Sequence, residues 1–88
     1  MTNYFFEFIN KVKAERDYQL KKWGDEFDRK NTPNDWIAYI VSYTGKAVTL
    51  PWNKETFKTM LVKVAALCAA AYEWCDRTDG NMPKRHYD

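Results

Sequence analysis

Apolar side chains recur every three or four residues from about residue 3 to residue 22, the period of an α-helix with one buried face. The apolar positions of this first segment are Phe5, Phe8, Ile9, Val12 and Leu20. The stripe ends near Trp23, and the following Gly24 is typical of a helix C-terminus. Arg16 and Gln19 interrupt the stripe, so this polar pair belongs either to the rim of a core or to a pocket.

A second helix is predicted from Pro33 to about Val48. Thr32 is a good N-cap, Pro33 suits the first helical position, and Asp35 completes a Thr-x-x-Asp capping pattern. The predicted inner face consists of Trp36, Ile37, Ile40, Val41, Thr44 and Val48. A second, polar and aromatic face consists of Asp35, Tyr39, Ser42, Tyr43 and Lys46.

A third helix is predicted to begin after the cap Asn53 and to run to about Arg77. One apolar face is formed by Phe57, Met60, Leu61, Val64, Leu67, Cys68, Ala71 and Cys75. Residues 64–72 carry no charge, and the rest of this run is rich in alanine. A helix that is apolar all round must be covered all round. Two other helices cannot easily do this, so the alanine-rich side predicts contact with a second subunit.

These patterns predict an all-α fold, in which a three-helix protomer forms a helical bundle completed by oligomerisation. A chain of 88 residues fits one domain, and burial in a domain this small is limited. Four Trp, six Tyr and five Phe are more aromatics than such a core needs, which indicates a subunit interface, a ligand pocket or both. The domain is predicted to span residues 1–80, with residues 81–88 as a flexible C-terminal tail.

Composition excludes several classes of function. The net charge of +2 is spread along the chain, which argues against binding of double-stranded nucleic acid. No signal peptide or membrane span is recognisable, so we expect no membrane partner and a cytoplasmic location. Cys68 and Cys75 are seven residues apart in one helix, too far for a disulfide. We interpret both as buried, reduced core residues.

The sequence contains no complete set of catalytic residues of a familiar kind. There is no glycine-rich phosphate loop, and the one histidine, His86, lies in the predicted tail. Glu73 and Asp76 share one side of the third helix, where they form either half of a Mg²⁺ site or a solvated helix end.

Basic and aromatic side chains on the helices are the more suggestive group. Aromatic rings can stack on a base, and Arg or Lys can pair with phosphate. The candidate ligand-binding residues are Arg16, Trp23, Tyr39, Tyr43, Lys46, Trp52 and Lys63. The alternative for each of them is ordinary packing at a helix rim.

The stretch Glu15-Arg16-x-x-Gln19-x-x-Lys22-Trp23-Gly24 resembles the opening motif of small phage-associated MazG-like proteins. These are relatives of the all-helical nucleoside triphosphate pyrophosphohydrolases. The stretches 35–40, 45–47, 61–66 and 73–77 look like later parts of the same family, so the resemblance covers roughly residues 8 to 78. It implies a MazG-like fold and a nucleotide pocket.

The resemblance also implies a loss of the metal site. Catalytic members hold Mg²⁺ with Glu-x-x-Glu on one helix and Glu-x-x-Asp on the next. The corresponding positions here, 41–47 and 60–63, contain no acid and include Lys46 and Lys63. We therefore expect a phage protein that binds a nucleotide or cyclic nucleotide without a cofactor and without cleaving it, as an anti-defence protein that sequesters a host signal in the host cytoplasm.

Two alternatives remain at this point. One is a Mg²⁺-dependent nucleoside triphosphate pyrophosphohydrolase that uses Glu15, Glu73 and Asp76. The other is an inhibitor that binds a host enzyme through its aromatic surface.

Overall fold

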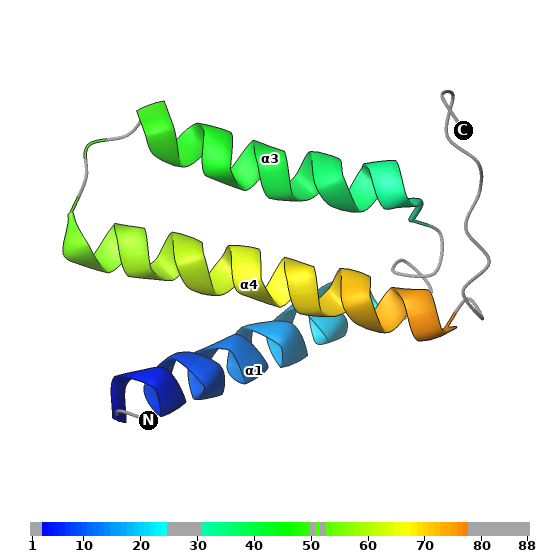
Figure 1. Cartoon of the computed structure of the whole chain (residues 1–88), viewed down its shortest axis with the longest axis horizontal. Coiled ribbons are helices and arrows are strands. Elements are labelled where there is room, and N and C mark those ends of the chain that lie inside the picture. Colours follow the sequence, from blue (N-terminus) through cyan, green and yellow to red (C-terminus); the bar gives the residue numbers. More distant parts are fainter. Residues whose placement is uncertain (1–2, 25–30, 50, 52, 78–88) are drawn as a thin grey trace.

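The part of the chain that the structure describes forms three packed α-helices, which confirms the predicted all-α class. A computed structural model describes residues 3–24, 31–49, 51 and 53–77. The helices are α1 (Asn3–Trp23), α3 (Pro33–Thr49) and α4 (Lys54–Arg77) (Figure 1). Each boundary lies within one residue of its prediction. Trp52 and the predicted tail, 81–88, lie outside the described residues. No described helix combines the length and the apolar character needed to cross a bilayer.

The helix ends follow the local signals in the sequence. The backbone N–H of Thr32 donates to Asp35 Oδ2 at 2.8 Å, and the N–H of Asp35 donates to Thr32 Oγ1 at 3.3 Å. This reciprocal pair satisfies two donors that the first turn of α3 leaves open. Asn53 Oδ1 accepts the N–H of Thr56 at 2.9 Å and caps α4. Gly24 ends α1 with a φ of 83°, a left-handed conformation that favours glycine.

Removing the cap of α3 is expected to destabilise the fold measurably. Thr32→Ala leaves the N–H of Asp35 without its acceptor, which typically costs about 1 kcal/mol. For a domain of this size that corresponds to a fall in Tm of roughly 4–8 °C. Thermal unfolding followed by circular dichroism measures the change. Thr59→Ala, at an exposed position inside α4, is the matched control and should show no such fall.

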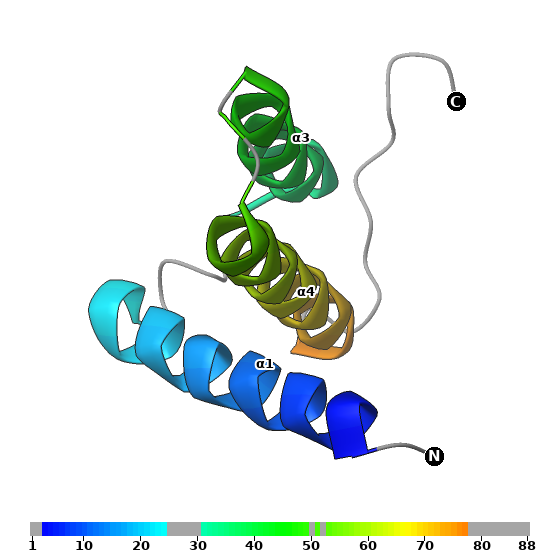
Figure 2. The ribbon, with the colours of Figure 1, turned by 90° about the vertical axis from the view of Figure 1, so that its left-hand side faces the viewer.

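α4 is the central helix. It lies between α1 and α3, and in the described residues the backbones of α1 and α3 approach α4 but not each other (Figure 2). The core contains Trp36 from α3 with Ala70 and Trp74 from α4. Ala66 of α4 is also fully buried, with none of its surface exposed. Small side chains on α4 let its neighbours approach closely, while the two indoles fill the remaining volume.

The structure corrects the predicted faces of two helices. On α3, Trp36 is buried as expected, but Ile37, Val41 and Val48 are exposed. On α4, Ala66 and Ala70 of the alanine-rich side are buried within this chain, whereas Ala65 and Ala69 are only half-buried. The predicted inner residues Phe57, Leu61 and Cys68 are exposed instead. The reason is volume: alanine at the crossing positions permits helix contact, so the larger apolar side chains turn outward.

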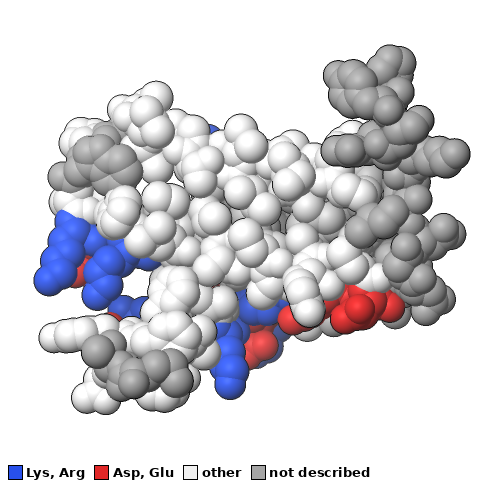
Figure 3. Space-filling model, viewed as in Figure 1, with Lys and Arg blue, Asp and Glu red and all other residues white. Residues whose placement is uncertain are grey.

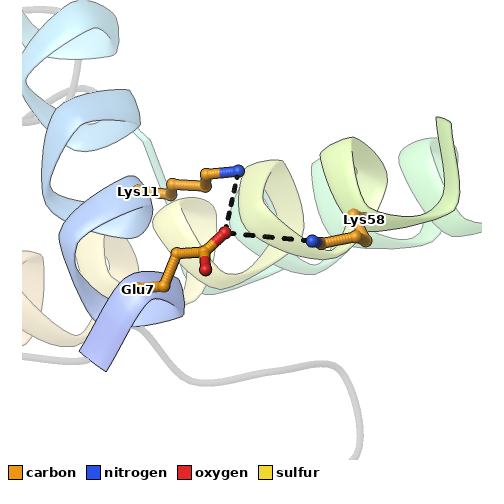
Figure 4. A network of polar contacts seen from close by, with 3 residues as sticks. All are labelled: Glu7, Lys11 and Lys58. Carbon is orange, nitrogen blue, oxygen red and sulfur yellow. Dashed lines mark ion pairs between the residues drawn. The ribbon is translucent and has the colours of Figure 1, made fainter. Parts of the chain in front are cut away.

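Two ion-pair groups join α1 to α4. Near the start of α1, Glu7 Oε1 lies 3.4 Å from Lys11 Nζ and 3.9 Å from Lys58 Nζ (Figure 4). All three side chains are about half exposed, so this network contributes little to stability. Further along, the buried Arg16 donates from Nη2 to Glu73 Oε2 at 3.1 Å. Because Arg16 is largely shielded from water, this second pair fixes how α1 crosses α4.

Candidate functional site

A cavity of about 270 Å³ lies where the C-terminal half of α1 meets α3 and α4. Four of the predicted ligand-binding residues come together in its wall: Trp23, Tyr39, Tyr43 and Lys63. The remaining lining residues are Glu15, Tyr18, Gln19, Lys22, Trp36, Leu67 and Ala70. Five of the eleven lining residues are thus aromatic, and four are polar or charged. This combination is typical of small-molecule sites.

The ring of Tyr39 is held in place from two sides. Its hydroxyl donates to Asn31 Oδ1 at 3.1 Å, and its ring meets that of Trp36 edge to face, with centroids 6.1 Å apart. Trp36 is 3% exposed. Its indole N–H has no acceptor among the described residues. The indole therefore belongs to the packed core behind the cavity, and its ring, not its N–H, contributes to the wall.

Two cations and one carboxylate give the cavity its charge. Lys63 of α4 is half-buried. Lys22 Nζ lies 5.0 Å from the ring centroid of Trp23 and 5.8 Å from that of Tyr18, both within cation–π range. Glu15 accepts a hydrogen bond from Gln19 Nε2 at 3.1 Å. Lysines therefore outnumber carboxylates in this wall by two to one. An anion is favoured there over a cation.

The family-like motif on α1 supplies one side of the cavity. Glu15, Gln19, Lys22 and Trp23 all line it, at the i, i+4, i+7 and i+8 spacing that places them on one helical face. The sequence singled out Trp23 but missed Lys22 and, on α3, Trp36. Lys22 is three residues after Gln19, and Trp36 is three residues before Tyr39. This helical spacing places each beside a cavity residue and could have identified both.

Arg16 is placed elsewhere. The sequence predicts a phosphate contact for it, but it does not line the cavity, and its guanidinium contacts Glu73 of α4. The position that interrupts the apolar stripe of α1 therefore serves helix packing. We leave Arg16 out of the binding site.

Lys46 lines a second hollow that adjoins the first. This groove of about 330 Å³ runs between the C-terminal half of α3 and the N-terminal half of α4. Tyr43 and Lys63 line both hollows, so they stand at the junction. Lys46 and Lys63 thus border one shared groove. This placement agrees with the expectation that the two lysines lie near a common hollow.

The acidic side chains do not assemble into a recognisable metal site. No group of three or more Asp, Glu, His or Cys residues converges in the part of the chain that the structure describes. Glu73 is held by Arg16, while Glu15 lines the aromatic cavity. The three acids of the hydrolytic alternative are therefore not brought to one point.

A third hollow is an open groove of about 680 Å³ between α1 and the N-terminal half of α4. It contains none of the predicted ligand-binding residues. Its charged side chains include the Glu7–Lys11–Lys58 network, whose charges compensate one another (Figure 4). We therefore place the candidate site in the smaller aromatic cavity. No protein family, curated protein or solved structure matches this chain.

Proposed function

We propose that this protein binds a nucleotide or cyclic nucleotide in the aromatic cavity between α1, α3 and α4 and does not cleave it. The observation that carries the proposal is the convergence of Trp23, Trp36, Tyr39 and Tyr43 with Lys22 and Lys63 around one cavity. The rings suit a base, and the ammonium groups suit a phosphate.

The two adjoining hollows suggest how such a ligand lies. A base stacks in the cavity against its aromatic rings. The phosphate meets Lys63 at the junction. The groove beyond it, with Lys46 in its wall, accommodates a second phosphate or a second nucleotide. A cyclic dinucleotide uses both hollows, whereas a mononucleotide uses only the first.

Binding without hydrolysis follows from the same residues. Metal-assisted cleavage of a phosphoanhydride needs carboxylates that hold Mg²⁺ against the phosphates. The side chains at the junction are a lysine and a tyrosine. An ammonium group there binds phosphate directly and repels a divalent cation.

The biological setting rests on the α1 motif. Its resemblance to phage-associated MazG-like proteins, together with the replaced acids, supports a MazG-like homo-oligomer that sequesters a nucleotide signal of host defence. Glu15, Gln19, Lys22 and Trp23 of that motif line the cavity, so its most family-like residues are those that would meet the ligand.

The decisive experiment combines ligand release with direct binding. Mass spectrometry of the denatured protein identifies any nucleotide that co-purifies. Titration with mono-, di- and cyclic nucleotides should quench the tryptophan fluorescence, because Trp23 and Trp36 line the cavity. A protein that releases nothing and binds no nucleotide contradicts the proposal. Magnesium-dependent release of pyrophosphate, lost in Glu73→Gln, would establish the hydrolytic alternative instead.

Lys22→Met is expected to weaken nucleotide affinity by roughly three- to tenfold, because it removes a cation that also positions the Trp23 ring. Isothermal titration measures the dissociation constant. Lys21→Met removes the same charge from the neighbouring exposed position, outside the cavity wall, and should leave affinity nearly unchanged. Equal effects of the two substitutions would mean that only net charge matters.

A further inference from the structure

One face of the α3–α4 hairpin is apolar, exposed and without charge over most of its length. We call it the outer face. Its exposed residues are Ile37, Val41 and Val48 on α3 and Phe57, Leu61, Cys68 and Tyr72 on α4. The space-filling view shows a broad uncharged surface over these two helices (Figure 3). Continuous apolar patches of this kind mark interaction sites.

The spacing of the outer face is symmetric. On α4, residues 57 and 72, and residues 61 and 68, are equally far from a point between residues 64 and 65. On α3, Ile37 and Val48 are equally far from a point between residues 42 and 43, and Val41 lies opposite the level of the half-buried Thr44. Tyr43 and Lys63 line the same two hollows, so both midpoints lie at nearly the same level of the hairpin. A twofold axis that crosses the hairpin at this level therefore exchanges position 57 with 72 and position 61 with 68 on α4. The same axis exchanges position 37 with 48 on α3.

The structure assigns this face to a second copy of the same chain. We propose a dimer in which two outer faces meet about a twofold axis that runs across the helices at this level. α4 then lies antiparallel on α4 of the partner, and α3 on α3. Phe57 faces Tyr72 of the partner subunit, Leu61 faces Cys68 of the partner subunit, and Ile37 faces Val48 of the partner subunit. A two-fold dimer needs such a self-complementary patch.

Charge supports the antiparallel direction. On the side of α4 next to the outer face, Lys54 and Lys58 lie near the start of the helix and Asp76 near its end, because Lys54 is about five turns from Tyr72 and Lys58 is about five turns from Asp76. Glu55 and Glu73 lie on the flank that faces α1. In Figure 3, basic side chains gather toward one end of α4 and acidic ones toward the other. The same axis places Lys54 within one residue of the level of Asp76 of the partner subunit. A parallel arrangement would instead juxtapose like charges, which is unfavourable.

This inference rests on the homo-oligomer of the proposed function and not on its nucleotide. A disulfide tests the register. In a Cys75→Ser background, Leu61→Cys places a thiol opposite Cys68 of the partner subunit. Positions 61 and 68 of one helix are about 10 Å apart and cannot bond to each other. We expect mild oxidation to give a covalent dimer on non-reducing gels. Cys68 alone should not cross-link, because the two copies of Cys68 in the dimer are about 10 Å apart along the direction of the α4 helices.

Two controls define the outcome. Thr59→Cys, in the same background, puts an exposed thiol about 200° round the helix from Leu61 and should not cross-link. Leu61→Glu should shift the chain from dimer to monomer in analytical ultracentrifugation, with its helical circular dichroism retained. A monomeric natural chain overturns both the homo-oligomer and this interface. A dimer in which Leu61→Cys gives no covalent product overturns the interface alone. Nucleotide binding is measured separately and does not depend on either result.

Discussion

Replacing Trp36 with alanine is expected to lower the free energy of unfolding by about 3–5 kcal/mol, which is most of the stability of a domain this small. The indole is 3% exposed and packs against Ala70 and Trp74. The alanines that surround it are too small to fill the space it leaves. The substitution also removes the edge-to-face contact that supports Tyr39.

Urea unfolding followed by circular dichroism measures this loss, at one fixed protein concentration because association adds to apparent stability. Tyr4→Ala is the control, since it removes an aromatic ring that is 82% exposed. We expect a large fall in the urea midpoint for Trp36→Ala and little change for Tyr4→Ala. Similar midpoints for the two variants would show that the hairpin is not held together at Trp36.

The helices were predictable because their signals are local. A cap such as Thr32 with Asp35, or a glycine such as Gly24, acts within four residues of its position. Apolar periodicity likewise needs only one helix. Each boundary could therefore be derived without knowledge of the other helices.

The buried faces were harder to predict because each helix has more than one apolar stripe. The neighbouring helices determine which stripe is buried. α4 offers a stripe of large side chains and a stripe of alanines. A sequence argument favours burial of the larger surface. The fold buries Ala66 and Ala70 instead, because close crossing of helices and two tryptophans supply the packing. The large side chains are left for another contact.

The candidate site was predictable where chemistry alone identified the residue. Tyr39, Tyr43 and Lys63 carry groups that can stack on a base or pair with phosphate, and all three line the cavity. Arg16 carries an equally suitable group for phosphate, but its partner Glu73 is 57 residues away. Nothing local in the sequence indicates that pairing. Long-range ion pairs of this kind have to be read from the fold.

Lys63→Met is expected to weaken binding of the nucleotide by roughly 10- to 100-fold. A charge-assisted hydrogen bond to phosphate contributes about 1.5–3 kcal/mol, and each 1.4 kcal/mol changes affinity about tenfold. Methionine keeps the length of the apolar stem, so packing at this half-buried position is largely preserved. The dissociation constant from isothermal titration gives the effect directly.

The affinities of Lys46→Met and Lys13→Met variants show which of the two hollows the ligand occupies. Lys46→Met should weaken binding only of a ligand that extends into the adjoining groove, such as a cyclic dinucleotide. Lys13→Met, at an exposed position of α1 outside both hollows, should weaken neither. Because a phosphate at the junction contacts Lys63 whichever hollows the ligand fills, every nucleotide that binds should depend on Lys63. Full affinity in Lys63→Met would place the phosphate elsewhere and remove the electrostatic basis of the proposed site.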